Sequence, residues 1–92
     1  MSEASRTVEI VNKKGLHARA SAKFVKLAAT FNAEVKVSRE DSEWVDARSI
    51  MGLMMLAAAI GSSIDIRAEG EQATEAVDAL ADLVAARFDE DE

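Results

Sequence analysis

The chain of 92 residues contains no cysteine and no proline, and its only histidine stands at position 17. The absence of cysteine excludes a disulfide framework and a thiolate metal site, and it agrees with a reducing cytoplasm. With a single histidine, any metal site would have to consist mostly of carboxylates. We therefore expect the protein to work without a metal ion or another cofactor.

Long apolar runs are also missing from the sequence. The longest, residues 50–60, is far shorter than the roughly 20 residues that a membrane-spanning helix needs. Residues 1–7 carry charges and lack the apolar stretch of a signal peptide. The sequence therefore predicts a soluble, cytoplasmic protein that does not bind a membrane.

Basic residues are in the minority, because 11 Lys and Arg stand against 17 Asp and Glu, a formal net charge of −6. This balance argues against a nucleic-acid-binding protein, which would need basic side chains for the phosphates. Acids dominate from Asp65 onward. Basic residues gather around the histidine: Arg6, Lys13, Lys14, Arg19, Lys23 and Lys26. We expect this positive region to steer an acidic protein partner toward His17.

The spacing of apolar residues predicts the element order β-α-β-β-α-β-α. Alternation predicts strands over residues 7–11, 34–38, 43–48 and 63–68, and helical spacing predicts helices over residues 18–31, 50–60 and 71–88. Residues 1–6 and 89–92 are expected to be frayed. The pattern predicts one domain over residues 1–92, an α+β open-faced two-layer sandwich. Its four-stranded, mostly antiparallel sheet should carry three helices on one face.

Residues 15–19 read Gly-Leu-His-Ala-Arg and place His17 where the first strand gives way to the first helix. An imidazole that titrates near neutral pH can accept a phosphoryl group and later surrender it. The first backbone N–H groups of the helix, on Ala18, Arg19 and Ala20, would face the anion. The Arg19 guanidinium could chelate two phosphate oxygens. A lone histidine is more often structural than functional, but this position favours a role linked to an anion.

The segment at residues 50–60 is predicted to form a helix with apolar residues on nearly all sides. These residues form two stripes along the helix, and a helix that lies on a sheet can bury only one of them. One stripe contains Ile50, Leu53, Leu56, Ala57 and Ile60, and the other contains Met51, Met54, Met55 and Ala58. The methionines either fill the edge of a small core or form an exposed, adaptable patch for docking other proteins.

Ser49 stands immediately before this helix and is therefore a candidate N-cap. If it were phosphorylated, the added charge would suit the helix N-terminus and would make the neighbouring patch repulsive to an acidic partner. A serine hydrolase built on Ser49 and His17 is disfavoured, because the chain has no nucleophile elbow and no identifiable acid to orient the histidine. It also lacks a glycine-rich nucleotide loop, so any phosphate must come from another molecule.

The residues around His17 and those around Ser49 form two motifs that resemble the signatures of a bacterial family, the phosphocarrier protein HPr of the phosphoenolpyruvate-dependent phosphotransferase system. Residues 15–22 are similar to its active-site signature, residues 48–57 to its regulatory-serine signature, and the resemblance extends from Thr7 to Phe88. It implies that His17 accepts a phosphoryl group on Nδ1 from phosphorylated enzyme I and passes it to an enzyme IIA-type acceptor. Arg19 would stabilise the phosphate in transfer, and the protein would be a carrier without catalytic turnover of its own.

The resemblance further implies that an HPr kinase/phosphorylase can modify Ser49 and that the protein is a monomer. It implies a docking surface formed by Ile50, Met51, Met54, Met55 and Ala22. Ala20 stands where many relatives have proline, which predicts altered rigidity rather than lost function. The methionine-containing helix and the acidic tail resemble the nitrogen-related branch of the family. The alternative is a regulatory module that binds partners without covalent chemistry and is controlled mainly through Ser49.

Overall fold

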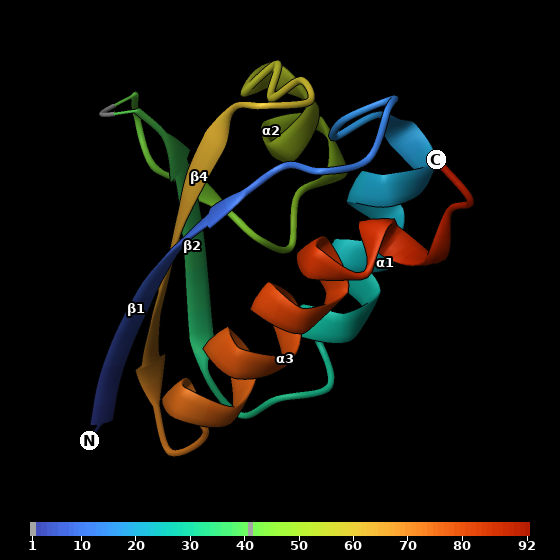
Figure 1. Cartoon of the computed structure of the whole chain (residues 1–92). Coiled ribbons are helices and arrows are strands. Elements are labelled where there is room, and N and C mark those ends of the chain that lie inside the picture. The colour runs from blue at the N-terminus through green and yellow to red at the C-terminus, as the bar shows by residue number, and fades with distance from the viewer. Residues whose placement is uncertain (1, 41) are drawn as a thin grey trace.

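The computed structural model describes residues 2–40 and 42–92. Its elements are β1 (Ser2–Glu9), α1 (Ala18–Ala28), β2 (Glu34–Arg39), β3 (Val45–Asp46), α2 (Ile50–Met55), β4 (Ser63–Gly70), α3 (Ala73–Ala85) and a short 3-10 helix, η1 (Arg87–Asp89). The predicted order of strands and helices is confirmed (Figure 1).

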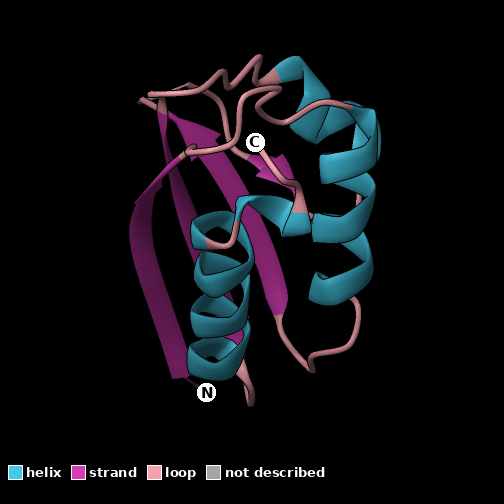
Figure 2. Cartoon of the chain, turned by 45° about the vertical axis from the view of Figure 1, so that its right-hand side comes forward, coloured by secondary structure: helices cyan, strands magenta, loops and turns pink. Residues whose placement is uncertain are grey.

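The four strands form one antiparallel sheet in the order β1-β4-β2-β3. Helices α1, α2 and α3 lie on the same side of this sheet and leave its other face open (Figure 2). The predicted α+β open-faced sandwich is therefore confirmed. Within the described residues, no helix is both long enough and apolar enough to cross a membrane.

The hydrophobic core fills the space between the sheet and the helices. Along β4, Ile64, Ile66 and Ala68 are buried while Arg67 and Glu69 are exposed, as expected for a strand with one covered face. The helices contribute buried residues at helical spacing: Ala20, Phe24 and Ala28 from α1, and Ala73, Ala76, Val77, Leu80 and Val84 from α3. The apolar stripes that the sequence shows on α1 and α3 therefore pack these helices against the sheet.

Strand β1 begins earlier than the sequence predicts. Residues 2–6, which we expected to be frayed, pair with β4 from Ser2 opposite Gly70 to Arg6 opposite Ile66. The reason is that β4 itself extends to Gly70 and offers its whole edge, so backbone hydrogen bonds order a segment with few apolar side chains. Residue 1 lies outside the described residues.

The second helix is shorter than predicted, because α2 ends at Met55 rather than at residue 60. Ala57 adopts a positive φ of 52°, which turns the chain out of the helix, and Leu56 and Ala58 then point into the core. Ala58 is therefore not part of an exposed stripe, contrary to the sequence prediction, whereas Ile60 is exposed. Burial of nearby apolar side chains overrides the local helical preference here.

The last helix also ends early. Helix α3 stops at Ala85, and the next turn contains three consecutive residues with positive φ, Arg87 (59°), Phe88 (52°) and Asp89 (62°). Phe88 is fully buried and anchors this turn in the core. The prediction of a frayed tail over residues 89–92 is wrong, because the turn directs these residues back onto the first turn of α1.

Candidate functional site

The loop before α1 holds His17 at the surface. Ile10 exchanges backbone hydrogen bonds with the segment before β4, and Leu16 N–H donates to the Ala58 carbonyl at 2.9 Å. Gly15 has a φ of +64°, and a Cβ there would collide with the same Ala58 carbonyl. The Asn12 side chain donates to the Gly15 carbonyl at 2.9 Å. Glycine at position 15 is thus required both for the turn and for the close approach of two backbone segments.

His17 is the N-cap residue of α1, with an extended backbone (φ −73°, ψ 179°). Its carbonyl accepts a hydrogen bond from Ser21 N–H at 2.8 Å, so the first N–H groups of the helix, on Ala18, Arg19 and Ala20, have no partner within the helix. Ala18 and Arg19 are exposed, whereas Ala20 is buried. The first turn is therefore open to an anion at its first two residues.

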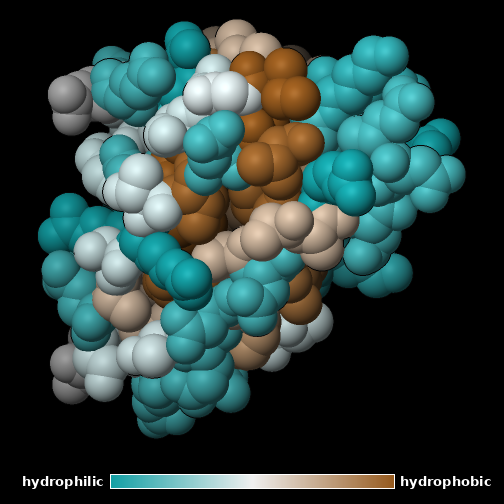
Figure 3. Space-filling model, in the orientation of Figure 1, coloured by the Kyte–Doolittle hydropathy of each residue, from teal (hydrophilic) through white to brown (hydrophobic). Residues whose placement is uncertain are grey.

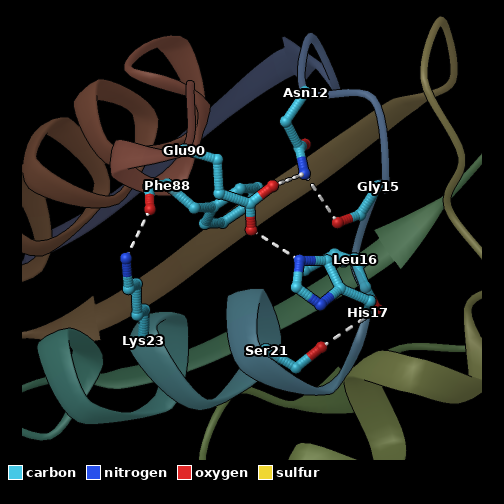
Figure 4. Close-up of polar contacts among 8 residues, drawn as sticks. All are labelled: Asn12, Gly15, Leu16, His17, Ser21, Lys23, Phe88 and Glu90. Atoms are coloured by element: carbon cyan, nitrogen blue, oxygen red, sulfur yellow. Dashed lines mark hydrogen bonds and ion pairs between the residues drawn. The ribbon is translucent and has the colours of Figure 1, made fainter. Parts of the chain in front are cut away.

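The His17 side chain is part-exposed at 27% and is held at one nitrogen. Its Nε2 lies 2.5 Å from Oε2 of Glu90, whose other oxygen accepts a hydrogen bond from Asn12 Nδ2 at 3.0 Å. Figure 4 shows the second ring nitrogen turned away from Glu90 and toward the start of α1. One nitrogen of the imidazole is thus engaged by a carboxylate, and the other faces the helix N-terminus.

Opposing effects act on the carboxyl group of Glu90. Burial raises its pKa, but hydrogen bonds from His17 and Asn12, together with the charges of His17 and Lys14, lower it further than burial raises it. The net pKa of Glu90 is below its ordinary value. The group is therefore a carboxylate at neutral pH and can only accept hydrogen bonds.

Glu90 is the residue beside His17 that the sequence does not predict, since we expected a frayed tail and could identify no acid to orient the histidine. The local sequence holds one signal that could have indicated it. Four acids, Asp89 to Glu92, follow directly after the apolar Phe88 and are opposite in charge to the region around His17. The decisive contact joins residues 73 positions apart, which spacing along the chain does not reveal.

His17 opens into a depression of about 450 Å³ that is rich in charge. Its lining comprises Lys13, Lys14, His17, Arg19, Lys23 and the four acids of the tail. The tail is held there by Lys23, whose Nζ donates to the Phe88 carbonyl at 2.7 Å, and by Lys13, whose backbone N–H donates to a main-chain oxygen of Glu92 at 2.9 Å. Arg19 makes no side-chain hydrogen bond or ion pair with the rest of residues 2–40 and 42–92, so it is available to a phosphate.

The second helix exposes the predicted apolar patch, which is visible as the brown surface in the upper part of Figure 3. The exposed side chains are Ile50 (40%), Met51 (68%), Met54 (39%) and Met55 (79%) of α2, and Ile60 (56%) in the turn between α2 and β4. Leu53 is buried beneath them. A shallow depression lined by both His17 and Met54 connects this patch to the histidine, and Ala22 is half-buried on α1. A partner that reaches His17 would therefore also meet α2.

Ser49 caps α2, since its Oγ accepts a hydrogen bond from Gly52 N–H at 2.9 Å. We expect Ser49→Ala to lower the free energy of unfolding by about 1 kcal/mol, because an N–H of the first turn loses its acceptor. Urea unfolding followed by circular dichroism measures this change. Ser49→Asp is the matched control, because aspartate caps a helix as well as serine does. Equal stability of the two variants would contradict a capping role.

The fold and the site define a class of protein: a small α+β domain that presents one histidine at a helix N-terminus. The family model described as "PTS HPr component phosphorylation site" matches residues 4–86. The chain belongs to this HPr family and is a phosphocarrier of the phosphotransferase system.

Individual relatives agree with this membership. The phosphocarrier protein HPr of Cupriavidus necator is 54% identical over 87 residues, which cover 95% of this chain and 97% of that protein. The phosphocarrier protein NPr of Shewanella violacea is 41% identical over 90 residues, which cover 98% of each chain. The crystal structure of HPr-C-His from Thermoanaerobacter tengcongensis aligns over the full length of both chains with a TM-score of 0.87 and 42% identity. The chain is thus similar to proteins of both names, with the higher identity to the HPr.

Proposed function

We propose that His17 is the residue that carries the phosphoryl group and that its Nδ1 forms the bond to phosphorus. The observation that carries this proposal is the placement of the ring, part-exposed at the N-cap of α1 with Nε2 held by Glu90. Nδ1 is then the nitrogen that keeps a lone pair for attack. It also faces the end of the helix that favours negative charge.

Phosphorylated enzyme I is the donor in this proposal and an enzyme IIA-type protein is the acceptor. Docking would bring the donor's phosphorus in line with Nδ1, while the free N–H groups of Ala18 and Arg19 bind the phosphate oxygens. The exposed Arg19 guanidinium would bind two further oxygens and offset the charge in the transition state. Lys14 at the rim would attract acidic partners toward the site, whereas Lys13 is paired with Glu92.

Incubation with enzyme I and phosphoenolpyruvate tests this function. The protein should become covalently phosphorylated, and the bond should be labile in acid and stable in base, as expected of a phosphohistidine. The rival function, a module that binds partners without covalent chemistry, predicts that no phosphate is ever bound covalently.

The carrier is proposed to act as a cytoplasmic monomer, which a single sedimenting species at the mass of one chain would support.

The apolar patch on α2 is the proposed docking surface for both partners, together with Ala22. We expect Met51→Asp to slow transfer from enzyme I by about tenfold or more, because a charge at the centre of an apolar contact costs at least 1 to 2 kcal/mol of binding energy. Stability should hardly change, since Met51 is 68% exposed. The rate of label transfer at low protein concentration measures the effect.

Trp44→Asp provides the matched control for this substitution, because Trp44 is also an exposed apolar residue (44%) and stacks on Arg67 of the sheet. It should leave the transfer rate within about twofold, since it lies outside the patch. Equal slowing by both substitutions would show that added negative charge, and not loss of docking contacts at α2, is responsible.

Ser49 is the proposed regulatory site, modified by an HPr kinase/phosphorylase. Its hydroxyl is half-buried at the cap of α2 and borders the docking patch. A phosphate there would place negative charge beside Met51 and Ile50 and would repel an acidic partner. Phosphopeptide mapping of the protein from cells tests this role. Recovery of phosphorylated His17 with Ser49 never modified would remove it.

A further inference from the structure

The C-terminal turn brings an acid to the histidine by a defined path. Arg87, Phe88 and Asp89 have φ values between 52° and 62°, so the chain reverses direction directly after α3. Phe88 is fully buried, and its carbonyl accepts a hydrogen bond from Lys23 of α1. The position of Glu90 is therefore set by the core and by α1 rather than by a free chain end.

Both oxygens of the Glu90 carboxylate are engaged on the loop that carries His17. Oε2 lies 2.5 Å from His17 Nε2, and Oε1 accepts from Asn12 Nδ2 at 3.0 Å (Figure 4). Asn12 is itself fully buried and also donates to the Gly15 carbonyl. The side chain of Glu90 is only 16% exposed. Such a carboxylate, fixed at both oxygens, determines the orientation of the ring that it binds.

We propose that Glu90 is a positioning residue for phosphoryl transfer, which keeps the proton on Nε2 of His17 and thereby presents the Nδ1 lone pair to phosphorus. This inference rests on the proposed function of His17. Since a carboxylate can only accept a hydrogen bond, the nitrogen that faces it must carry the hydrogen. The arrangement is similar to that in which an aspartate orients the histidine of a catalytic triad, except that the triad carboxylate accepts from Nδ1 and leaves Nε2 free.

The transfer step needs no proton to move. The Nδ1 lone pair forms the new N–P bond, while the bond from phosphorus to the donor breaks and its electron pair stays with the donor. The ring, which keeps its proton on Nε2, then bears a positive charge opposite the Glu90 carboxylate. When the phosphoryl group leaves for the acceptor, the N–P electrons return to Nδ1 and the ring becomes neutral again. Glu90 thus faces the charge that appears during transfer, which stabilises the transition state.

Glu90→Gln is the variant that tests this role, because it keeps the length of the side chain and removes its charge. The amide offers one acceptor, so it cannot accept from both His17 and Asn12 as the carboxylate does. Asp82→Asn is the matched control, since it removes the same charge from an exposed side chain of α3 that does not line the depression at His17. Both variants are made in the full chain, and circular dichroism verifies that each is folded.

Two phosphoryl donors distinguish an effect of the substitution on phosphoryl transfer from an effect on docking of enzyme I. Phosphorylated enzyme I must dock on the protein, whereas inorganic phosphoramidate is a small donor with a P–N bond and needs no docking surface. We expect Glu90→Gln to slow phosphorylation of His17 about tenfold with either donor, the size usual for the loss of such an orienting partner. Asp82→Asn should change both rates less than twofold. Slowing with enzyme I alone would assign Glu90 to docking and overturn the proposal.

NMR of the unphosphorylated protein, labelled with ¹⁵N, gives a second and independent readout. The wild type should show an Nε2-bound proton protected from exchange with water and a non-protonated Nδ1, and Glu90→Gln should lose that protection. Unchanged protection together with unchanged rates would overturn the role of Glu90. If the wild type itself accepted no phosphate on His17, the proposed function would fail, whereas the NMR result would still decide where the proton lies.

Discussion

His17→Ala is expected to abolish phosphorylation: with enzyme I and phosphoenolpyruvate, the variant should take up no label above background. Alanine provides no lone pair for attack on phosphorus, and His17 is the only histidine of the chain. Scintillation counting or intact-protein mass spectrometry after incubation measures the result, with the wild type in parallel.

Loss of label must come from lost chemistry rather than from unfolding. The His17 ring is part-exposed and packs into no core cluster, so its removal should cost only about 1 kcal/mol for the hydrogen bond to Glu90. Thermal unfolding verifies this. Ser49→Ala is the functional control and should still be labelled at His17. Label that persists in His17→Ala would refute the assignment of the carrier residue.

Gly15→Ala is expected to have the second largest effect, on stability and on transfer together. The alanine would have to adopt a φ of +64°, and its Cβ would collide with the backbone carbonyl of Ala58, which cannot move without disturbing the loop. We expect a loss of about 3 kcal/mol in the free energy of unfolding. Since the loop carries His17, a displacement of about 1 Å should also slow phosphorylation roughly a hundredfold.

Gly61→Ala distinguishes the cost of a positive φ from the cost of the collision with Ala58. Gly61 also has a positive φ, of +89°, but no atom lies within 4 Å of the position that its Cβ would take. This variant should lose only about 1 kcal/mol, the cost of a left-handed backbone, and should be phosphorylated at the normal rate. Urea unfolding and label uptake measure both variants. Equal stability losses would show that the contact with Ala58 is unimportant.

The topology and the centre of the site could be predicted because local signals carry them. Alternation marks β4 through Ile64 and Ile66, and helical spacing marks α3, since each element must bury one face. His17 and Arg19 are candidates from the sequence because a glycine and a predicted helix start coincide there. The exposure of Met51 and Met55 follows from a short helix that has more apolar residues than one face can cover.

The remaining features depend on contacts that are distant along the chain. Arg87, Phe88 and Asp89 contain no glycine to indicate a left-handed turn, and only the burial of Phe88 in the core makes that backbone favourable. Glu90 reaches His17 as a consequence of that turn. The early end of α2 has the same origin, because burial of Ala58 imposes a positive φ on Ala57. Local propensity could not predict these changes, which tertiary packing imposes.

The most direct test is to phosphorylate the ¹⁵N-labelled protein with enzyme I and phosphoenolpyruvate and to determine which nitrogen is bonded to phosphorus. One-bond coupling between ³¹P and ¹⁵N identifies that atom. We predict coupling to Nδ1 of His17, the nitrogen turned toward the start of α1, with a proton retained on Nε2 beside Glu90. Coupling to Nε2, or phosphate found on a residue other than His17, would contradict the mechanism.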